Sequence, residues 1–230
     1  IKKQIDKFSP EVCISDMEPA VPIISFWYRL PLISIDNQHR LTNLKFKVPK
    51  KYEKDFLIAK AAVRACISRA RAFIVLSFVK AKKETKNTYI VSPILRKEIL
   101  KLKPSQSDKI LVYQTKPNKR LLDILKETPE EFIVYGYNKN EKSKNLEFKL
   151  SGQEFIKDLS KCKAIIATAG FTLISEALYL KKPYFAMPLK GQFEQTINAL
   201  FLKDSRLGTF SEDPSKKEIL LFLKNLDKYE

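Results

Sequence analysis

Short apolar runs alternate with helical stretches along almost the entire chain, and no other feature of the sequence restricts the fold as strongly. Alternation of this kind is typical of parallel sheets, in which a helix connects each strand to the next. Strands are expected at residues 12–15, 31–35, 73–79, 88–92, 110–114, 132–135, 146–149, 164–168 and 184–187. Helices are expected at residues 1–8, 19–29, 52–72, 119–126, 153–160, 172–180, 193–202 and 214–226. The sequence therefore predicts an α/β fold.

An irregular stretch interrupts this alternation near the middle of the chain. It carries Pro93 and Pro104 and separates two series of strands and helices, so we interpret it as a connection between domains. The chain does not begin with Met and starts within a predicted helix, so we expect the first domain to lack its beginning. Asp213 is the expected N-cap of the last helix. The predicted parts are a first domain at 1–93, a connection at 94–107, a second domain at 108–212 and a C-terminal helix at 213–230.

The cysteine and histidine content argues against several kinds of site. The three cysteines, Cys13, Cys66 and Cys162, are far apart in apolar segments, which favours free thiols in a reducing cytosol. His39 is the only histidine, and no Cys/His spacing fits zinc. No apolar run has the length of a bilayer span, and there is no signal peptide pattern. We therefore expect a cytoplasmic protein without a bound metal.

The chain is strongly basic, with 43 Lys and Arg against 26 Asp and Glu and a net charge of +17. Such a balance favours anionic partners, which include phosphorylated small molecules, acidic lipid surfaces and nucleic acid. An equally good interpretation is a lysine-rich solvated surface without a specific partner. The charges are spread along the chain without an arginine-rich tract or a recognised nucleic-acid motif, so nucleic acid is not the expected partner.

Residues 164–178 carry the strongest indication of a binding site. A buried strand at 164–168 runs through Gly170 directly into a helix. The first turn of a helix has unpaired N–H groups and the positive end of the helix dipole, and small residues let a phosphate approach them. In an open α/β sheet this turn lies at the carboxyl ends of the strands, where ligands bind. An ordinary tight turn is the alternative, because the full glycine-rich fingerprint is absent.

Glu176 lies on the same helix, too far from Gly170 to form a capping box. A carboxylate there can accept two hydrogen bonds from the vicinal hydroxyls of a ribose, whereas the alternative is a partly exposed glutamate without a role. Downstream, a second strand ends in a Pro/Gly loop and enters a helix with Glu194 and Gln195 in its first turn. This pair supplies the directed donors and acceptors that bind sugars, although Glu suits the first turn of any helix.

Together these stretches resemble the nucleotide-sugar half of GT-B glycosyltransferases. They are similar to family 28, which includes the lipid II-forming N-acetylglucosaminyltransferase. The shared pattern is a glycine turn, Ser-Glu-Ala on the helix, Lys-Pro before a strand, a proline loop, and Glu-Gln followed by Asn-Ala. In this chain these are Gly170, Ser175-Glu176-Ala177, Lys182-Pro183, Pro188, Glu194-Gln195 and Asn198-Ala199. The likeness covers residues 9–210 and is weak between 52 and 107.

The resemblance implies a GT-B-like fold of two Rossmann-like domains that face each other across a cleft, with the N-terminal one truncated. It also implies that the glycine turn cradles the donor diphosphate, that the helix glutamate holds the ribose, and that residues after the next strand touch the donor sugar. The expected donor-binding residues are Gly170, Phe171, Thr172, Glu176, Gln192, Glu194 and Gln195.

A polar loop in the first domain resembles the acceptor side of the same family. It follows the strand at 31–35 and is rich in amide side chains. Asp16 and Glu18 follow the preceding strand and are expected to face the same cleft. The expected acceptor-side residues are Asn37, Gln38, His39 and Arg40.

The chain departs from the family in features that concern the chemistry. The glycine-rich loop that carries a catalytic base in some relatives is absent, so the base is unknown, with His39 and Asp16 as candidates. For His39, acceptor binding is preferred to the role of base, and a surface-loop histidine without a role is the remaining alternative. There is no Asp-x-Asp, so neither a metal nor another cofactor is expected. Helix dipoles and lysines would neutralise the leaving nucleotide instead.

The sequence as a whole predicts an inverting hexosyltransferase that moves a sugar from a UDP-linked donor to a hydroxyl acceptor; inversion is what the resemblance implies. A base would deprotonate the acceptor while the protein stabilises the departing diphosphate. A lipid-linked acceptor and peripheral contact with the inner face of an anionic membrane would fit the basic charge. A UDP-sugar epimerase of the same fold and a basic nucleic-acid-binding protein are the alternatives.

Overall fold

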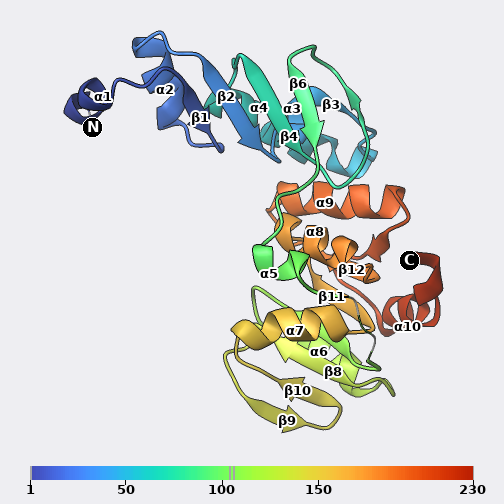
Figure 1. Cartoon of the computed structure of the whole chain (residues 1–230). Coiled ribbons are helices and arrows are strands. Elements are labelled where there is room, and N and C mark those ends of the chain that lie inside the picture. The colour runs from blue at the N-terminus through green and yellow to red at the C-terminus, as the bar shows by residue number, and fades with distance from the viewer. Residues whose placement is uncertain (1, 104, 106, 230) are drawn as a thin grey trace. The chain divides into compact units, whose positions relative to one another are not determined.

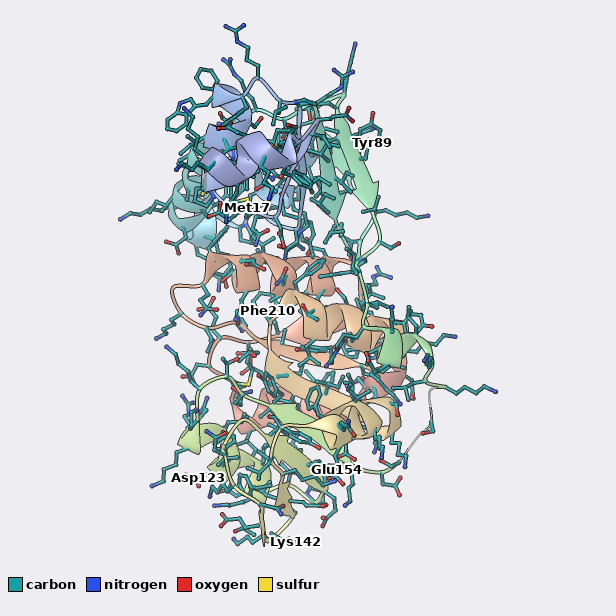
Figure 2. The ribbon with its side chains drawn as sticks, turned by 60° about the vertical axis from the view of Figure 1, so that its left-hand side comes forward. Met17, Tyr89, Asp123, Lys142, Glu154 and Phe210 are labelled. Carbon is teal, nitrogen blue, oxygen red and sulfur yellow. The ribbon has the colours of Figure 1, made fainter. Side chains whose placement is uncertain are left out.

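The computed structural model describes residues 2–103, 105 and 107–229, which form two compact units, unit 1 up to residue 94 and unit 2 from residue 95 onward. Of the stretch that the sequence assigns to the connection, Pro104 and Gln106 lie outside the described residues. Long side chains that end in nitrogen atoms project from the surfaces of both units, and Lys142 is one of them (Figure 2). Within the described residues, none of the helices combines the length and the apolar character that a bilayer span requires.

Unit 1 is built on a parallel sheet of four strands in the order β1-β2-β4-β6 (Figure 1). Its strands are β1 (Cys13–Ser15), β2 (Leu32–Asp36), β4 (Ala72–Leu76) and β6 (Thr88–Val91), with a small ribbon of β3 (Leu44–Lys45) and β5 (Lys82–Lys83). Its helices are α1 (Lys2–Phe8), α2 (Ala20–Trp27), α3 (Arg40–Asn43), the 3-10 turn η1 (Lys50–Tyr52) and α4 (Glu53–Cys66). The core residues are Cys13, Leu32, Leu44, Ile67, Phe73 and Val75.

Helix α4 ends earlier than the apolar spacing predicts. It stops at Cys66, and Ile67 is already extended with φ −139° and ψ 93°. Ile67 belongs to the core, and Ala70 packs against it, although both lie outside the helix. The periodic spacing continues past the helix because these residues face the same core from the segment that leads into β4. The prediction of a helix to residue 72 is therefore wrong at its C-terminal end.

Unit 2 is built on a sheet of seven strands in the order β13-β12-β11-β7-β8-β10-β9. The strands are β7 (Ile110–Tyr113), β8 (Phe132–Tyr135), β9 (Glu141–Ser143), β10 (Leu146–Phe148), β11 (Ala164–Thr168), β12 (Tyr184–Met187) and β13 (Gly208–Phe210). All neighbours are parallel except β9, which forms a hairpin with β10 at one end of the sheet (Figure 1). From β7 the chain builds outward through β8 and β10, and it then returns to the other side of β7 with β11. The strand order therefore reverses between β7 and β11, the position where open α/β sheets bind ligands.

Apart from a short helix at Lys97–Leu100, which lies in the stretch predicted to be an irregular connection, the helices of unit 2 follow the predicted alternation closely. They are α5 (Lys97–Leu100), α6 (Lys119–Lys126), α7 (Gln153–Lys161), α8 (Phe171–Tyr179), α9 (Phe193–Asp204), α10 (Lys216–Lys224) and the 3-10 turn η2 (Leu226–Tyr229). The N-cap of α10 is Ser215, which forms a capping box with Glu218. Asp213, the expected N-cap, is instead paired with Arg120. The buried face of α10 joins the core of the unit through Ile219, Phe222 and Leu223.

Candidate active site

A cavity of about 800 Å³ opens in unit 2 at the carboxyl ends of β7 and β11, where the strand order reverses. Five of the seven residues expected to bind the donor line it: Gly170, Phe171, Thr172, Glu176 and Gln195. Sequence reasoning missed its other lining residues, which are Arg96, Tyr113, Thr115, Ser151, Gly152, Gln153, Phe155, Ile156, Thr168 and Leu173. The glycine turn and the helix that follows it therefore face a cavity, and their binding of a donor stays a prediction.

Two helices begin at this cavity without a side-chain cap. Gly170 is the N-cap of α8, Gly152 is the N-cap of α7, and neither helix has a capping hydrogen bond from a side chain. The two backbone carbonyls just before Gly170 accept hydrogen bonds from side chains of unit 2: Tyr184 donates to Thr168 O (2.7 Å) and Asn198 donates to Ala169 O (2.8 Å). The N-terminal turns of both helices thus present N–H groups and partial positive charge to one space.

The space in front of Gly170 is open. A Cβ atom built on Gly170 would meet no atom within 4 Å, and its φ of −70° and ψ of 134° suit any residue. The fold therefore does not require glycine here. Close by, the hydroxyls of Thr115 and Thr168 lie 3.1 Å apart at the ends of β7 and β11. A phosphate could therefore approach the α8 N-terminus past Gly170 and these two hydroxyls, although Phe171 and Phe155 line the same cavity.

Glu176 is buried and paired with an arginine. Its side chain is 1% exposed, and both carboxylate oxygens accept hydrogen bonds of 2.6 Å from Nε and Nη2 of Arg96. The hydrogen bond to Glu176 raises the pKa of Arg96 above its ordinary value. The alternative of a partly exposed helix glutamate is therefore wrong, whereas a role of Glu176 in donor binding stays a prediction. Arg96 escaped sequence reasoning because it lies 80 residues from its partner and belongs to no motif.

The second donor-side stretch contributes one side chain to the cavity. Gln195 on α9 lines it, accepts a hydrogen bond from Leu189 N (3.1 Å) and donates to the side chain of Gln192 (2.6 Å). Neither Gln192 nor Glu194 is among the lining residues. Their contact with a donor sugar stays a prediction.

Neutralisation of the nucleotide by lysines stays a prediction, and three lysines line another cavity of unit 2, of about 460 Å³. Lys116, Lys119 and Lys190 line it, beside Gln114 at the end of β7. Among the described residues, the single cationic side chain that lines the 800 Å³ cavity is that of Arg96. Within the described part of the chain, no three His, Cys, Asp or Glu side chains are placed to hold a metal ion.

The polar loop of unit 1 is folded around the buried carboxylate of Asp36. Asp36 accepts hydrogen bonds from Ser34 Oγ (2.5 Å) and from the backbone N–H of His39 (2.7 Å), and its Oδ2 lies 2.7 Å from His39 Nδ1. Burial opposes ionisation of Asp36, but the hydrogen bonds and charge of His39 outweigh it, so the pKa of Asp36 is lowered. Nε2 of His39 faces Ile67 O at 3.2 Å, and its ring packs on Phe73. Both ring nitrogens of His39 are thus engaged within unit 1.

The other acceptor-side candidates have different surroundings. Arg40 Nε donates to Asn37 O (2.7 Å), and Gln38 is half-buried. Asp16 is exposed directly after β1. Glu18 caps α2, because its carboxylate accepts from the backbone N–H groups of Ala20 and Val21 (2.7 and 3.3 Å). The acceptor roles assigned from the sequence stay predictions, and Glu18 has a local structural role.

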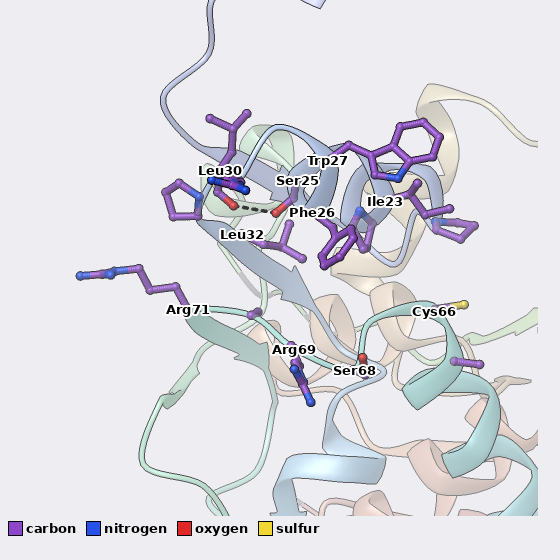
Figure 3. A pocket seen from close by; sticks show the side chains of 16 residues that line it. Ile23, Ser25, Phe26, Trp27, Leu30, Leu32, Cys66, Ser68, Arg69 and Arg71 are labelled. Atoms are coloured by element: carbon purple, nitrogen blue, oxygen red, sulfur yellow. Dashed lines mark hydrogen bonds between the residues drawn. The ribbon is translucent and has the colours of Figure 1, made fainter. Parts of the chain in front are cut away.

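A larger cavity, of about 1270 Å³, lies elsewhere in unit 1. It is lined by α2, the end of α4 and the segments leading into β2 and β4, at the amino ends of these strands. Figure 3 shows Phe26 and Trp27 projecting from α2, with Arg69 and Arg71 on the segment before β4. Ligand sites of parallel sheets lie at the opposite, carboxyl ends, so the 800 Å³ cavity is the better candidate for chemistry.

Comparison with known proteins gives a family and a fold. The sequence matches the family described as Glycosyl transferase family 1 over residues 1–227. No curated protein sequence matches the chain. A GT-B-like α/β fold is confirmed, and so is the resemblance to GT-B glycosyltransferases, whereas the narrower likeness to family 28 stays a prediction. The epimerase and nucleic-acid-binding alternatives gain no support.

Several solved structures share the fold at low identity. The kitacinnamycin glycotransferase has 10% identity and a TM-score of 0.68 over 98% of this chain and 70% of its own. Arabidopsis thaliana UGT89C1, complexed with UDP-L-rhamnose, has 11% identity and a TM-score of 0.69 over 99% and 67%. A UDP-glucosyltransferase from Polygonum tinctorium has 12% identity and a TM-score of 0.69 over 100% and 71%. The chain thus spans about two thirds of the length of these structures.

Proposed function

The chain belongs to glycosyl transferase family 1, and from this premise we propose that it transfers a sugar from a UDP-linked donor to a hydroxyl acceptor. The observation that carries the proposal is the 800 Å³ cavity, in which two uncapped helix N-termini and a buried carboxylate meet at the reversal of strand order. Two proteins of the same fold support the choice of nucleotide, since one was solved with UDP-L-rhamnose and the other is a UDP-glucosyltransferase.

In this proposal the donor diphosphate lies at the N-terminus of α8, beside Gly170 and Thr172. The N–H groups and dipoles of α8 and α7 stabilise the negative charge that develops on the leaving UDP. The ribose hydroxyls donate to Glu176, whose buried carboxylate is a strong acceptor. Gln195 lines the same cavity and contacts the sugar, together with the exposed Gln192 and the half-buried Glu194.

The acceptor side belongs to unit 1 in this proposal, with residues 37–40 as its ligands and inversion as the stereochemical course. A base must take the proton of the acceptor hydroxyl. Asp16 is the better of the two candidates, because its carboxylate is exposed at the carboxyl end of β1. His39 would first have to release the carboxylate of Asp36 or the carbonyl of Ile67.

Substituting Gly170 tests where the phosphate lies. In Gly170→Ala the new methyl group meets no protein atom, so the free energy of unfolding should change by less than about 1 kcal/mol. The methyl would occupy the approach to α8, and loss of a charge-assisted hydrogen bond predicts UDP binding that is weaker by about 10- to 100-fold in calorimetric titration. Gly170→Ser should behave alike, because its hydroxyl would cap the same N–H groups. Unchanged UDP affinity in both variants would show that the diphosphate does not lie there.

A lipid-linked acceptor and contact with an anionic membrane are the finer parts of the proposal, and they are supported by the surface of α2. Phe26 and Trp27 are 80% and 74% exposed, and Arg29, Arg69 and Arg71 line the same cavity (Figure 3). Exposed aromatic rings among arginines suit the headgroup region of an acidic bilayer.

Charge reversal tests this membrane contact. Each arginine near an acidic bilayer contributes about 1 kcal/mol, so Arg69→Glu/Arg71→Glu should weaken co-sedimentation with phosphatidylserine vesicles by about 10- to 100-fold. Lys142→Glu/Lys217→Glu, which reverses two exposed lysines of unit 2 on β9 and α10, lowers the net charge by the same amount and is the control. Equal losses in the two variants would indicate attraction by net charge alone, without a docking surface on α2.

A further inference from the structure

Arg96 stands between the Glu176 carboxylate and the cavity. Both side chains line the cavity, but Glu176 is 1% exposed whereas Arg96 is 44% exposed. Among the described residues, the guanidinium is the sole hydrogen-bond partner of that carboxylate, with one bond of 2.6 Å to each oxygen. The guanidinium fork takes two of the roughly four acceptor positions of a carboxylate. Because the side chain of Glu176 is 1% exposed, the hydroxyls of a ligand would have to bind where the fork now binds.

A nucleoside can reach Glu176 only if this ion pair opens. The bonds between a guanidinium and a buried carboxylate are charge-assisted, and two ribose hydroxyls replace them with weaker bonds to the carboxylate alone. Arg96 would then be left without its anionic partner. A ligand that carries a ribose and no phosphate thus loses most of the affinity that its hydroxyls would otherwise contribute.

A diphosphate makes opening of the Arg96–Glu176 pair less costly, because it brings a second anion into the same cavity, with which Arg96 can pair. The two uncapped helix N-termini attract phosphate to the end of the cavity formed by Gly152 and Gly170. The planar fork of an arginine fits phosphate oxygens as well as it fits a carboxylate. The exposed part of Arg96 leaves its guanidinium free to turn, while the buried side chain of Ile99 anchors the segment behind it.

We propose that Arg96 makes recognition of the ribose conditional on a bound diphosphate. In the empty site the guanidinium holds Glu176, and in the occupied site it binds the diphosphate while the ribose hydroxyls take its place on the carboxylate. Both the Arg96 guanidinium and the Glu176 carboxylate keep a hydrogen-bond partner in each state. This exchange of partners therefore costs less than an opening of the ion pair that leaves either group unpaired. The inference rests on the proposed function, and it makes Arg96 the residue that discriminates UDP-linked ligands from free nucleosides.

The coupling can be measured with the two halves of the ligand. Uridine is titrated calorimetrically into the whole chain with and without inorganic pyrophosphate, and UDP is titrated as the reference. In the wild type, pyrophosphate should raise the affinity for uridine by about 5- to 150-fold, the usual range of coupling between two sites. In Arg96→Gln this enhancement should disappear. Uridine alone should then bind more tightly than to the wild type, and UDP more weakly.

Two further variants complete the design. Arg120→Gln removes an exposed, ion-paired arginine elsewhere in unit 2 and should keep the full coupling. Arg96→Lys retains the charge without the fork, so it should reduce the coupling even if Arg96→Gln does not fold. The inference would be overturned if pyrophosphate did not change the affinity of the wild type for uridine, or if Arg96→Gln bound uridine more weakly than the wild type. The proposed function would still stand in either case, provided that the wild type binds UDP. A wild type that binds no UDP would overturn both.

Discussion

Replacing Glu176 by Ala should weaken the binding of UDP by about 100-fold or more. Two hydrogen bonds from ribose hydroxyls to a buried carboxylate are worth about 1.5–3 kcal/mol each, and release of Arg96 for the diphosphate offsets part of their loss. Calorimetric titration of UDP into wild type and variant measures the difference. The unit should stay folded, because Arg96 is 44% exposed and its guanidinium can turn to water.

Glu154→Ala is the matched control for this experiment. Glu154 is also a helix glutamate of unit 2, in the first turn of α7, but its side chain is 72% exposed and does not line the cavity. Its loss should leave the affinity for UDP unchanged. Should Glu176→Ala bind UDP as the wild type does, the Glu176–Arg96 pair would be structural. A wild type that binds no nucleoside diphosphate would remove the donor assignment of the cavity altogether.

Replacing Gly136 by Ala should destabilise unit 2 by roughly 2–6 kcal/mol, through overpacking and backbone strain together. Gly136 follows β8 with a φ of +92°, and a Cβ atom there would lie 1.9 Å from the carbonyl oxygen of Gln114. That oxygen belongs to the backbone next to β7, so it cannot move aside as a side chain would. Urea unfolding followed by circular dichroism measures the loss.

A second glycine of the same unit serves as the comparison. Gly152 also lies between a strand and a helix, but its backbone is extended and a Cβ atom would meet nothing within 4 Å. Gly152→Ala should therefore unfold at nearly the urea concentration of the wild type. Equal stability of Gly136→Ala and Gly152→Ala would mean that the segment after β8 relaxes at little cost.

The fold was predictable where a local pattern determines it. Buried parallel strands are continuous apolar runs, and amphipathic helices repeat every 3.6 residues, so both can be recognised in sequence. β9 and β13 were missed because neither contains an apolar run: β9 is Glu-Lys-Ser, and β13 is Gly-Thr-Phe. Both pair at the ends of the sheet, where partners supplied by the tertiary fold decide the conformation.

The candidate site, too, was predictable only where residues that are close in the sequence form it. Gly170 and Glu176 could be found because a strand, a turn and a helix follow one another without interruption. Arg96 could not, since only the folded unit brings it to Glu176 across 80 residues. The buried surroundings of His39 were hidden as well. The sequence around it is that of a polar loop, and its bond to the carbonyl of Ile67 depends on where α4 ends.

The position of Trp27 determines what optical spectroscopy can report. It is the single tryptophan of the chain, and it lies on α2 of unit 1 with 74% of its surface exposed. Its fluorescence should therefore resemble that of indole in water even in the folded protein. Unfolding of unit 2 would leave this emission nearly unchanged and has to be followed through tyrosine or the peptide backbone. Insertion of α2 into a bilayer, in contrast, would shift the emission to shorter wavelength, so the natural sequence already carries a probe for that event.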